Sequence, residues 1–195
     1  MDRLAKQLEF LLTAERLTGV QRRNVLFDLS RQESSAEHSW HMALMAAVLR
    51  EHFPEEIDLS RALEMSLAHD LIEVHAGDTF AYDNTSKADK DAREQRGADL
   101  LFGQLPDDQA QRLRALWDDF EAATSPEARF ARVLDRLQPL LLHKLTGGAA
   151  WKKHSVKKSQ VLARVKEIER HAPALWPWVS SLIEEATRAG QLQDA

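Results

Sequence analysis

The stretch SPEARFARVLDRLQPLLLHKL, residues 125–145, is the part of the chain that decides the fold. Ser125 and Pro126 are typical of a helix start, because a serine side chain caps free N–H groups and proline suits the first helical turn. Apolar residues then recur at spacings of three and four, which predicts one buried helix face. These positions are Phe130, Val133, Leu134, Leu137 and Leu141. The stretch therefore predicts a long helix that is buried along one side.

Asp135 lies at the edge of that apolar face, beside Ala131 and Leu142. A carboxylate in such surroundings loses its hydration, which costs free energy unless the charge is paired or bound to a metal. A salt bridge to Arg132 or Arg136 is one explanation, and a metal site is the other.

Similar patterns extend outward from this helix in both directions. Ser34 and Glu37 have the spacing of a capping box, and Gly77 and Gly147 mark chain breaks. The further predicted helices cover residues 2–18, 34–52, 58–77, 87–102, a segment that begins at 106, 157–171 and 175–189. Residues 20–33 read as a polar connector, and 77–86 as a segment rich in turn formers. We expect an all-α, compact, single-domain helical bundle of about seven helices over residues 1–195.

Composition supports this expectation and excludes several classes of protein. The chain has 195 residues, of which 44% are hydrophobic and 29% charged, with only 7 Gly and 6 Pro, as in one helical globular domain. The absence of cysteine excludes disulfides, thiolate metal sites and a cysteine nucleophile, and we expect a cytoplasmic protein. No apolar run approaches the ~18 residues that would span a membrane. A net charge of −5 argues against non-specific binding of nucleic acid.

Two histidines have a setting that points to chemistry. His38 lies in AEHSW, and His69 is followed by Asp70 in AHDLIEVHAGD. A single helical histidine is more often a hydrogen-bonded core residue than a ligand. Asp70, however, is about 100° round the helix from His69, so both side chains can reach one ion. With Asp135 the set offers two imidazoles and two carboxylates, which suits Mn, Fe, Co, Ni, Zn or Mg.

Two further carboxylates follow the His69–Asp70 pair. Glu73 comes four residues after His69 and shares its helical face, which makes it the best candidate for a general acid or base. Asp78, in the turn after Gly77, is a second candidate, although aspartate is also an ordinary turn residue. Glu37 is interpreted as a capping carboxylate.

The ordered strings AEHSW, AHDLIEVHAGD and RFARVLDRLQPLL resemble the H…HD…D signature of the HD superfamily, and most closely its 5′-deoxynucleotidase-like branch. The resemblance implies that His38, His69, Asp70 and Asp135 bind a divalent metal, and that Glu73 and Asp78 match the HDxxE…GD extension, where a second ion is conceivable. It also implies removal of phosphate from nucleoside 5′-monophosphates, often 2′-deoxy ones, through attack by a metal-bound water in a homodimer.

Two residues upstream of AEHSW are candidates for contacts to the substrate. Arg23 matches an arginine of this branch, and a guanidinium there would clamp a phosphate, although a solvated arginine is the simpler reading. At the next position relatives usually carry tryptophan, whereas this chain has Asn24, so the resemblance leaves the sugar preference open. The basic stretch 151–158 either attracts the anionic substrate or forms a solvated turn. Trp176 and Trp178 belong either to the core or to a dimer contact.

The leading hypothesis is therefore a metal-dependent phosphohydrolase that acts on a small phosphate ester and not on nucleic acid. The alternatives are an HD phosphodiesterase or alarmone hydrolase, and a non-catalytic sensor of metal or nucleotide. A metal-free helical scaffold is a third reading, and it predicts purified protein without stoichiometric metal.

Overall fold

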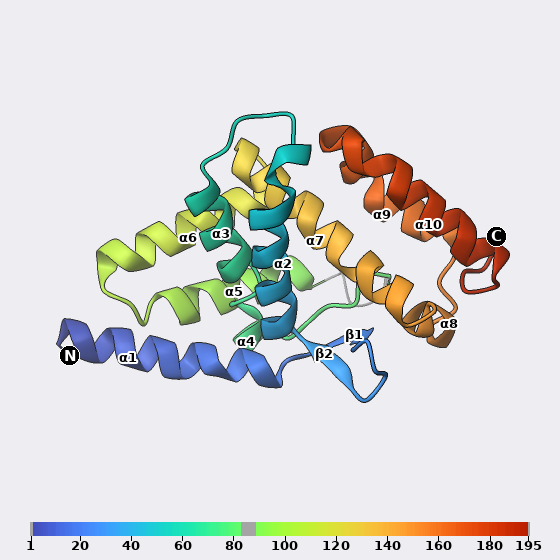
Figure 1. The fold of residues 1–195 in the computed structure, drawn as a ribbon. Coiled ribbons are helices and arrows are strands. Elements are labelled where there is room, and N and C mark those ends of the chain that lie inside the picture. Colours follow the sequence, from blue (N-terminus) through green and yellow to red (C-terminus); the bar gives the residue numbers. More distant parts are fainter. Residues whose placement is uncertain (1, 83–88, 195) are drawn as a thin grey trace.

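The computed structural model describes residues 2–82 and 89–194, which form α-helices, short 3₁₀ helices and one two-stranded sheet (Figure 1). The α-helices are α1 (Arg3–Ala14), α2 (Ser35–Leu49), α3 (Leu59–Ala68), α4 (Glu73–Ala76), α5 (Lys90–Phe102), α6 (Asp107–Ala122), α7 (Pro126–Leu145), α8 (Ala149–Lys153), α9 (Lys158–His171) and α10 (Trp176–Arg188). The 3₁₀ helices are η1 (Glu15–Gly19), η2 (Arg50–His52) and η3 (Pro173–Leu175). The strands are β1 (Gln21–Val25) and β2 (Gln32–Ser34), which pair antiparallel.

The predicted all-α class is confirmed, with more helices in the described residues than the expected seven or so. Two of the additional helices have a clear origin: the predicted helix over 58–77 is divided into α3 and α4, and residues 149–153 form the short helix α8. The predicted polar connector over 20–33 contains β1 and β2. The turn-rich segment 77–86 is described only as far as residue 82, and the predicted helix over 87–102 from residue 89 on.

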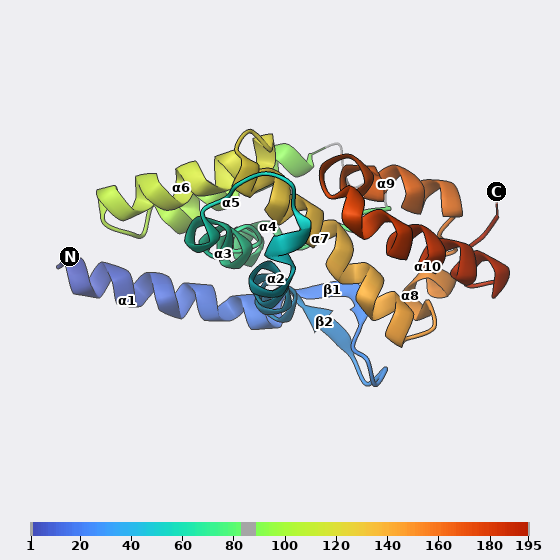
Figure 2. The same cartoon turned by 45° about the horizontal axis from the view of Figure 1, so that its top comes forward.

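The helix α7 forms the centre of the fold. α2, α3, α6 and α9 all contact it, and Figures 1 and 2 show it crossing the molecule between the α5–α6 side and the α9–α10 pair. Its predicted apolar face is buried, with Phe130, Val133, Leu134 and Leu137 at most 3% exposed. Because helices surround α7, the acidic residue on it, Asp135, is only 7% exposed.

Two predicted helix starts, those of α2 and α7, are confirmed in atomic detail. At α2 the Ser34 hydroxyl accepts a hydrogen bond from the Glu37 N–H at 3.2 Å, and the Glu37 carboxylate accepts one from the Ser34 N–H at 2.9 Å. At α7 the Ser125 hydroxyl accepts from the Ala128 N–H at 3.0 Å, and Pro126 occupies the first turn. Pro106 precedes α6 as its N-cap residue instead of its first helical residue. These caps hold the two helices that carry His38 and Asp135.

The predicted continuous helix over 58–77 is wrong at its centre. After Ala68 the chain tightens into turns with hydrogen bonds from Leu71 N–H to the Ala68 carbonyl and from Glu73 N–H to the Asp70 carbonyl. These three-residue hydrogen bonds replace the four-residue α pattern. Gly77 then ends α4 with a φ of 73°, a conformation that glycine adopts without strain. The turn presents His69 and Asp70 from the C-terminal end of α3.

Several apolar side chains lie outside the core. On α1 the leucines at helical spacing are exposed, with Leu4 at 59% and Leu12 at 67%, while Phe10 is buried at 7%. On α2 the outward positions Trp40, Leu44 and Val48 are also exposed. In the described ranges no helix has the length and apolar character that crossing a bilayer requires.

Candidate metal centre

Residues from three separate segments converge at the centre of the molecule. His38 of α2, His69 at the end of α3 and Asp135 of α7 are all buried, and their ligand atoms lie within 4.8 Å of one another. Asp70 joins them, because its carboxylate oxygens lie 3.2 Å from His69 Nε2 and 3.9 Å from His38 Nε2. The structure thus brings together all four residues that the sequence suggested for metal binding.

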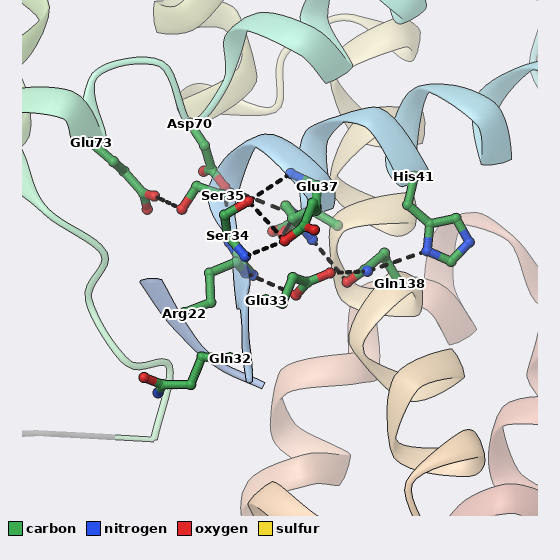
Figure 3. A network of polar contacts seen from close by, with 12 residues as sticks. Arg22, Gln32, Glu33, Ser34, Ser35, Glu37, His41, Asp70, Glu73 and Gln138 are labelled. Atoms are coloured by element: carbon green, nitrogen blue, oxygen red, sulfur yellow. Dashed lines mark hydrogen bonds and ion pairs between the residues drawn. The ribbon is translucent and has the colours of Figure 1, made fainter. Parts of the chain in front are cut away.

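The orientation of His38 is set by Gln138, three residues after Asp135 on α7. The Gln138 side-chain N–H donates to Glu33 at 2.6 Å (Figure 3). Its amide oxygen is therefore the atom that accepts from His38 Nδ1 at 2.8 Å. With its proton on Nδ1, a neutral His38 directs an Nε2 lone pair at Asp135 Oδ1, 3.1 Å away. Two acceptors at this distance repel each other, so a cation or a second proton is needed between them.

His69 gives a second indication that this cluster binds a cation. Its Nδ1–H donates to the Ser66 carbonyl at 2.9 Å, which leaves Nε2 as the free acceptor. Nε2 is buried and faces Asp70 Oδ1, itself an acceptor, at 3.2 Å, and no residue of the described ranges donates a hydrogen bond to it. Buried polar atoms rarely remain without a partner, and metal-binding histidines usually donate their other ring N–H to a carbonyl or carboxylate. The donor set therefore fits a divalent ion.

Each of the two aspartates also contacts an arginine. Asp70 Oδ2 lies 2.8 Å from Arg22, and Asp135 Oδ2 pairs with Arg136, so the predicted salt bridge to Arg136 is present beside the cluster. Burial alone would raise the pKa of Asp70, but His69 when it is protonated, together with Arg22, outweighs burial and holds the pKa well below its ordinary value. Arg136, together with His38 when it is protonated, likewise outweighs burial at Asp135 and lowers its pKa. Both aspartates are therefore anionic and able to bind a metal.

Glu73 and Asp78 lie beside this cluster, and their pKa values are raised, whereas those of the two aspartates in the cluster are lowered. Glu73 is 7% exposed and accepts a hydrogen bond from the Ser35 hydroxyl at 2.6 Å (Figure 3). Burial, followed by the charge of Asp70, raises its pKa well above the ordinary value. Burial also raises the pKa of Asp78, and Asp70 adds to the shift against the opposing effect of Arg22. Carboxyl groups with a raised pKa in a cavity are candidates for proton transfer.

A cavity of about 480 Å³ opens onto these groups. His69, Asp70, Glu73, Asp78 and Asp135 line it. Basic side chains also line it, namely Arg22, Arg23, Lys90, Arg132, Arg136 and Arg164. Its size is in the range of small-molecule sites, and its charges suit an anionic ligand next to a cation.

Arg23 and Asn24, the residues suggested for substrate binding, both line the cavity from β1. Sequence reasoning missed the neighbouring Arg22, which contacts Asp70 and lies 3.4 Å from Glu33. It also missed Gln138 and Arg164. Gln138 was accessible in principle, because its spacing of three places it on the same face of the helix as Asp135.

The basic stretch 151–158 lies away from the cavity wall, since none of its side chains is among the lining residues. Lys152 and Lys153 are exposed on α8, and Lys158 pairs with Glu184 at 2.6 Å. The His154 ring contacts Phe80, a cavity residue, in a tilted arrangement with ring centroids 4.8 Å apart. The described structure thus favours solvated surface for Lys152 and Lys153, whereas Trp151 and Val156 are buried, and α8 covers only residues 151–153 of the stretch.

Comparison with known proteins agrees with this arrangement. The 5′-deoxynucleotidase HDDC2 of Homo sapiens is 31% identical over 135 residues, which are 69% of this chain and 65% of that protein, so the chain spans slightly less than two thirds of its length. A crystal structure from Magnetospirillum magnetotacticum MS-1, described as a predicted metal-dependent phosphohydrolase, is 43% identical with a TM-score of 0.93, covering 98% of this chain and 96% of that one. A conserved hypothetical protein from Pyrococcus furiosus shares the fold at 20% identity and a TM-score of 0.64, covering 93% of this chain and 99% of that one.

The family match covers most of the chain and contains the whole cluster. The HD domain family matches residues 14–176, a range that includes His38, His69, Asp70 and Asp135. Together with the geometry of these side chains, this match shows that the chain belongs to the HD domain family.

Proposed function

We propose that residues 1–195 form one HD-type domain that acts as a divalent-metal-dependent phosphohydrolase on nucleoside 5′-monophosphates, including 2′-deoxy ones. The observation that carries the proposal is the convergence of His38, His69, Asp70 and Asp135 at a cavity lined by arginines. The names of the human relative and of the Magnetospirillum structure support the substrate class and the use of a metal.

His38, His69, Asp70 and Asp135 would hold the ion, which is Mn, Co, Fe, Ni, Zn or Mg. A bound divalent ion lowers the pKa of water and offsets negative charge on a phosphoryl group. Arg22 and Arg136 keep the two aspartates anionic, and Gln138 keeps the proton of His38 on Nδ1. The chain thus supplies a preorganised, deprotonated set of donors.

Glu73 is the proposed proton carrier. Burial raises its pKa, which favours the protonated form, and because Oε2 accepts from the Ser35 hydroxyl, Oε1 is the oxygen proposed to carry the proton. As the oxygen of water bonds to phosphorus and the ester P–O bond breaks, this proton passes to the leaving alcohol oxygen, and the attacking water supplies one proton in return. Asp78 lies on the same cavity and orients water.

Arg23 and Asn24 are the proposed contacts to the substrate from β1. Arg22 is held by Asp70, whereas Arg23 is exposed and forms no ion pair with a described residue, so it is available for a phosphate. Asn24 offers an amide where a tryptophan would form an apolar sugar pocket. We therefore expect ribonucleotides to be accepted beside deoxyribonucleotides.

The test is elemental analysis followed by phosphate release from a panel of nucleoside 5′-monophosphates under several divalent metals. We expect the wild type to retain metal and to release phosphate. His69→Ala and Asp70→Ala should abolish both metal retention and turnover. His75→Ala is the matched control, because His75 is exposed on α4 and should leave both unchanged. Metal-loaded protein that hydrolyses none of these substrates would contradict the proposal. Turnover of cyclic nucleotides or an alarmone alone would favour the diesterase alternative, and tight binding without turnover would favour the sensor.

We also propose that the chain forms a homodimer through α2 and α10. The outward face of α2 carries Trp40, Leu44 and Val48, and no charged residue occurs between Ser39 and Leu49. An adjacent apolar groove of about 520 Å³ is lined in part by Trp178, which is 38% exposed. A two-fold interface brings like surfaces together, so an uncharged face can meet its copy without repulsion. Light scattering tests the dimer. We expect the wild type to be a dimer and the Leu44→Glu variant to be a monomer.

For the location we propose the cytoplasm, in keeping with the absence of cysteine. Cell fractionation with a specific antibody tests this proposal.

A further inference from the structure

We propose that Arg164, on α9, binds the phosphate group of the substrate. The inference rests on the proposed phosphohydrolase function and adds a binding residue to it. Arg164 lies outside the strings that contain the four proposed metal ligands, and it reaches their cavity only through the packing of α9 on α7.

Arg164 lies close to the proposed metal centre. It lines the cavity together with Asp135 and Arg136, and the charges of both residues act on it. The charge of Arg22, which holds Asp70, acts on it as well. Arginines from β1, α7 and α9 therefore surround the space beside Asp70 and Asp135.

Arg164 differs from Arg22, Arg132 and Arg136 in having no carboxylate partner in the described ranges. Arg132 pairs with Glu167 at 2.8 Å, Arg136 pairs with Asp135, and Arg22 pairs with Asp70 at 2.8 Å. Glu167 is one turn from Arg164 on α9, but it faces Arg132 and Arg136 instead. The guanidinium of Arg164 is thus left free to face the cavity.

This placement is unfavourable without an anion. Burial, followed by the like charge of Arg136, lowers the pKa of Arg164. Partly buried charges are normally paired, and nearby like charges oppose the charged form. A phosphate placed between Arg164 and the metal centre would reverse both effects, since a guanidinium binds phosphate oxygens through two parallel hydrogen bonds.

A purely structural Arg164 predicts the opposite behaviour on substitution. If its stem and charge stabilise the packing of α9, then Arg164→Gln lowers the unfolding temperature whether or not phosphate is present. If Arg164 binds phosphate, then Arg164→Gln removes an unpaired cation and leaves the phosphate-free protein as stable as wild type, or more stable.

The experiment measures the binding of inorganic phosphate to the full chain by calorimetry and by the shift in unfolding temperature, with and without Mn²⁺. Arg164→Gln is compared with wild type, with Arg164→Lys, and with Arg170→Gln as a matched control from the exposed face of α9. We expect Arg164→Gln to weaken phosphate binding at least tenfold and to abolish the thermal shift. Arg164→Lys should bind with intermediate affinity because lysine lacks the planar fork, and Arg170→Gln should match wild type.

Phosphate binding by Arg164→Gln within twofold of wild type would overturn the inference, as would a wild type that binds no phosphate. The inference would also be overturned if Arg164→Gln lowered the unfolding temperature of the phosphate-free protein while Arg164→Lys bound phosphate as tightly as wild type. These outcomes do not depend on turnover. A protein that hydrolyses no nucleotide but loses phosphate binding on Arg164→Gln would refute the proposed function and still support the role of Arg164.

Discussion

Replacing Gln138 by leucine is expected to weaken both the fold and the proposed metal centre. Gln138 is fully buried, accepts from His38 Nδ1 and donates to Glu33. Leucine has a similar volume but no polar atoms, so the His38 Nδ1–H and the Glu33 oxygen both lose their partner. Each unpaired buried group costs roughly 1–3 kcal/mol. The free energy of unfolding should therefore fall by about 2–6 kcal/mol.

The same change should also affect metal binding. Without an acceptor for Nδ1–H, His38 no longer has one preferred tautomer and ring orientation, and losing such a partner typically lowers metal affinity about 10–100-fold. Urea unfolding and metal titration against a fluorescent chelator measure the two effects. Gln7→Leu is the matched control, since Gln7 bonds to Gln109 between α1 and α6, outside the cavity lining. Wild-type metal affinity in the Gln138→Leu protein would refute the reasoning.

Three further outcomes are expected. Glu73→Gln should retain the metal but lower turnover about 100-fold or more, because general acid catalysis contributes at least that factor; unchanged turnover at saturating substrate would exclude the role. Burial lowers the pKa of His143 from 6.5 to about 3. Between these two values the unfolded chain binds a proton at His143 that the folded chain does not. The free energy of unfolding should therefore fall by up to about 1.4 kcal/mol per pH unit as pH decreases from 6.5 towards 3. His143→Phe should reduce that slope in urea unfolding at pH 8, 6 and 5, with no effect of this group above its unfolded pKa. Ser34→Ala should cost about 1 kcal/mol of stability by removing the cap of α2, and a loss below 0.3 kcal/mol in the same assay would contradict the capping role.

Local signals in the sequence determined most of the helices. The apolar spacing of residues 130–141 and the caps at Ser34 and Ser125 act within one or two turns, so they can be read without knowledge of the fold. The candidate site was likewise marked by a local feature, the adjacency of His69 and Asp70. The same reasoning failed after Ala68, where turns replace the helix, because nothing in the local periodicity marks the interruption.

Contacts between distant segments decided the rest. The sequence alone suggested Arg23 as a phosphate contact, and only the structure showed that the neighbouring Arg22 contacts Asp70, while Arg23 lines the same cavity. The partnership of His38 with Gln138 spans 100 residues, and that of His38 with Asp135 spans 97. The lack of a carboxylate for Arg164 in the described residues depends on how α9 packs on α7. Helical periodicity specifies which face of a segment is buried, but only tertiary packing specifies which side chains that face contacts. The chemistry of this site depends on those contacts.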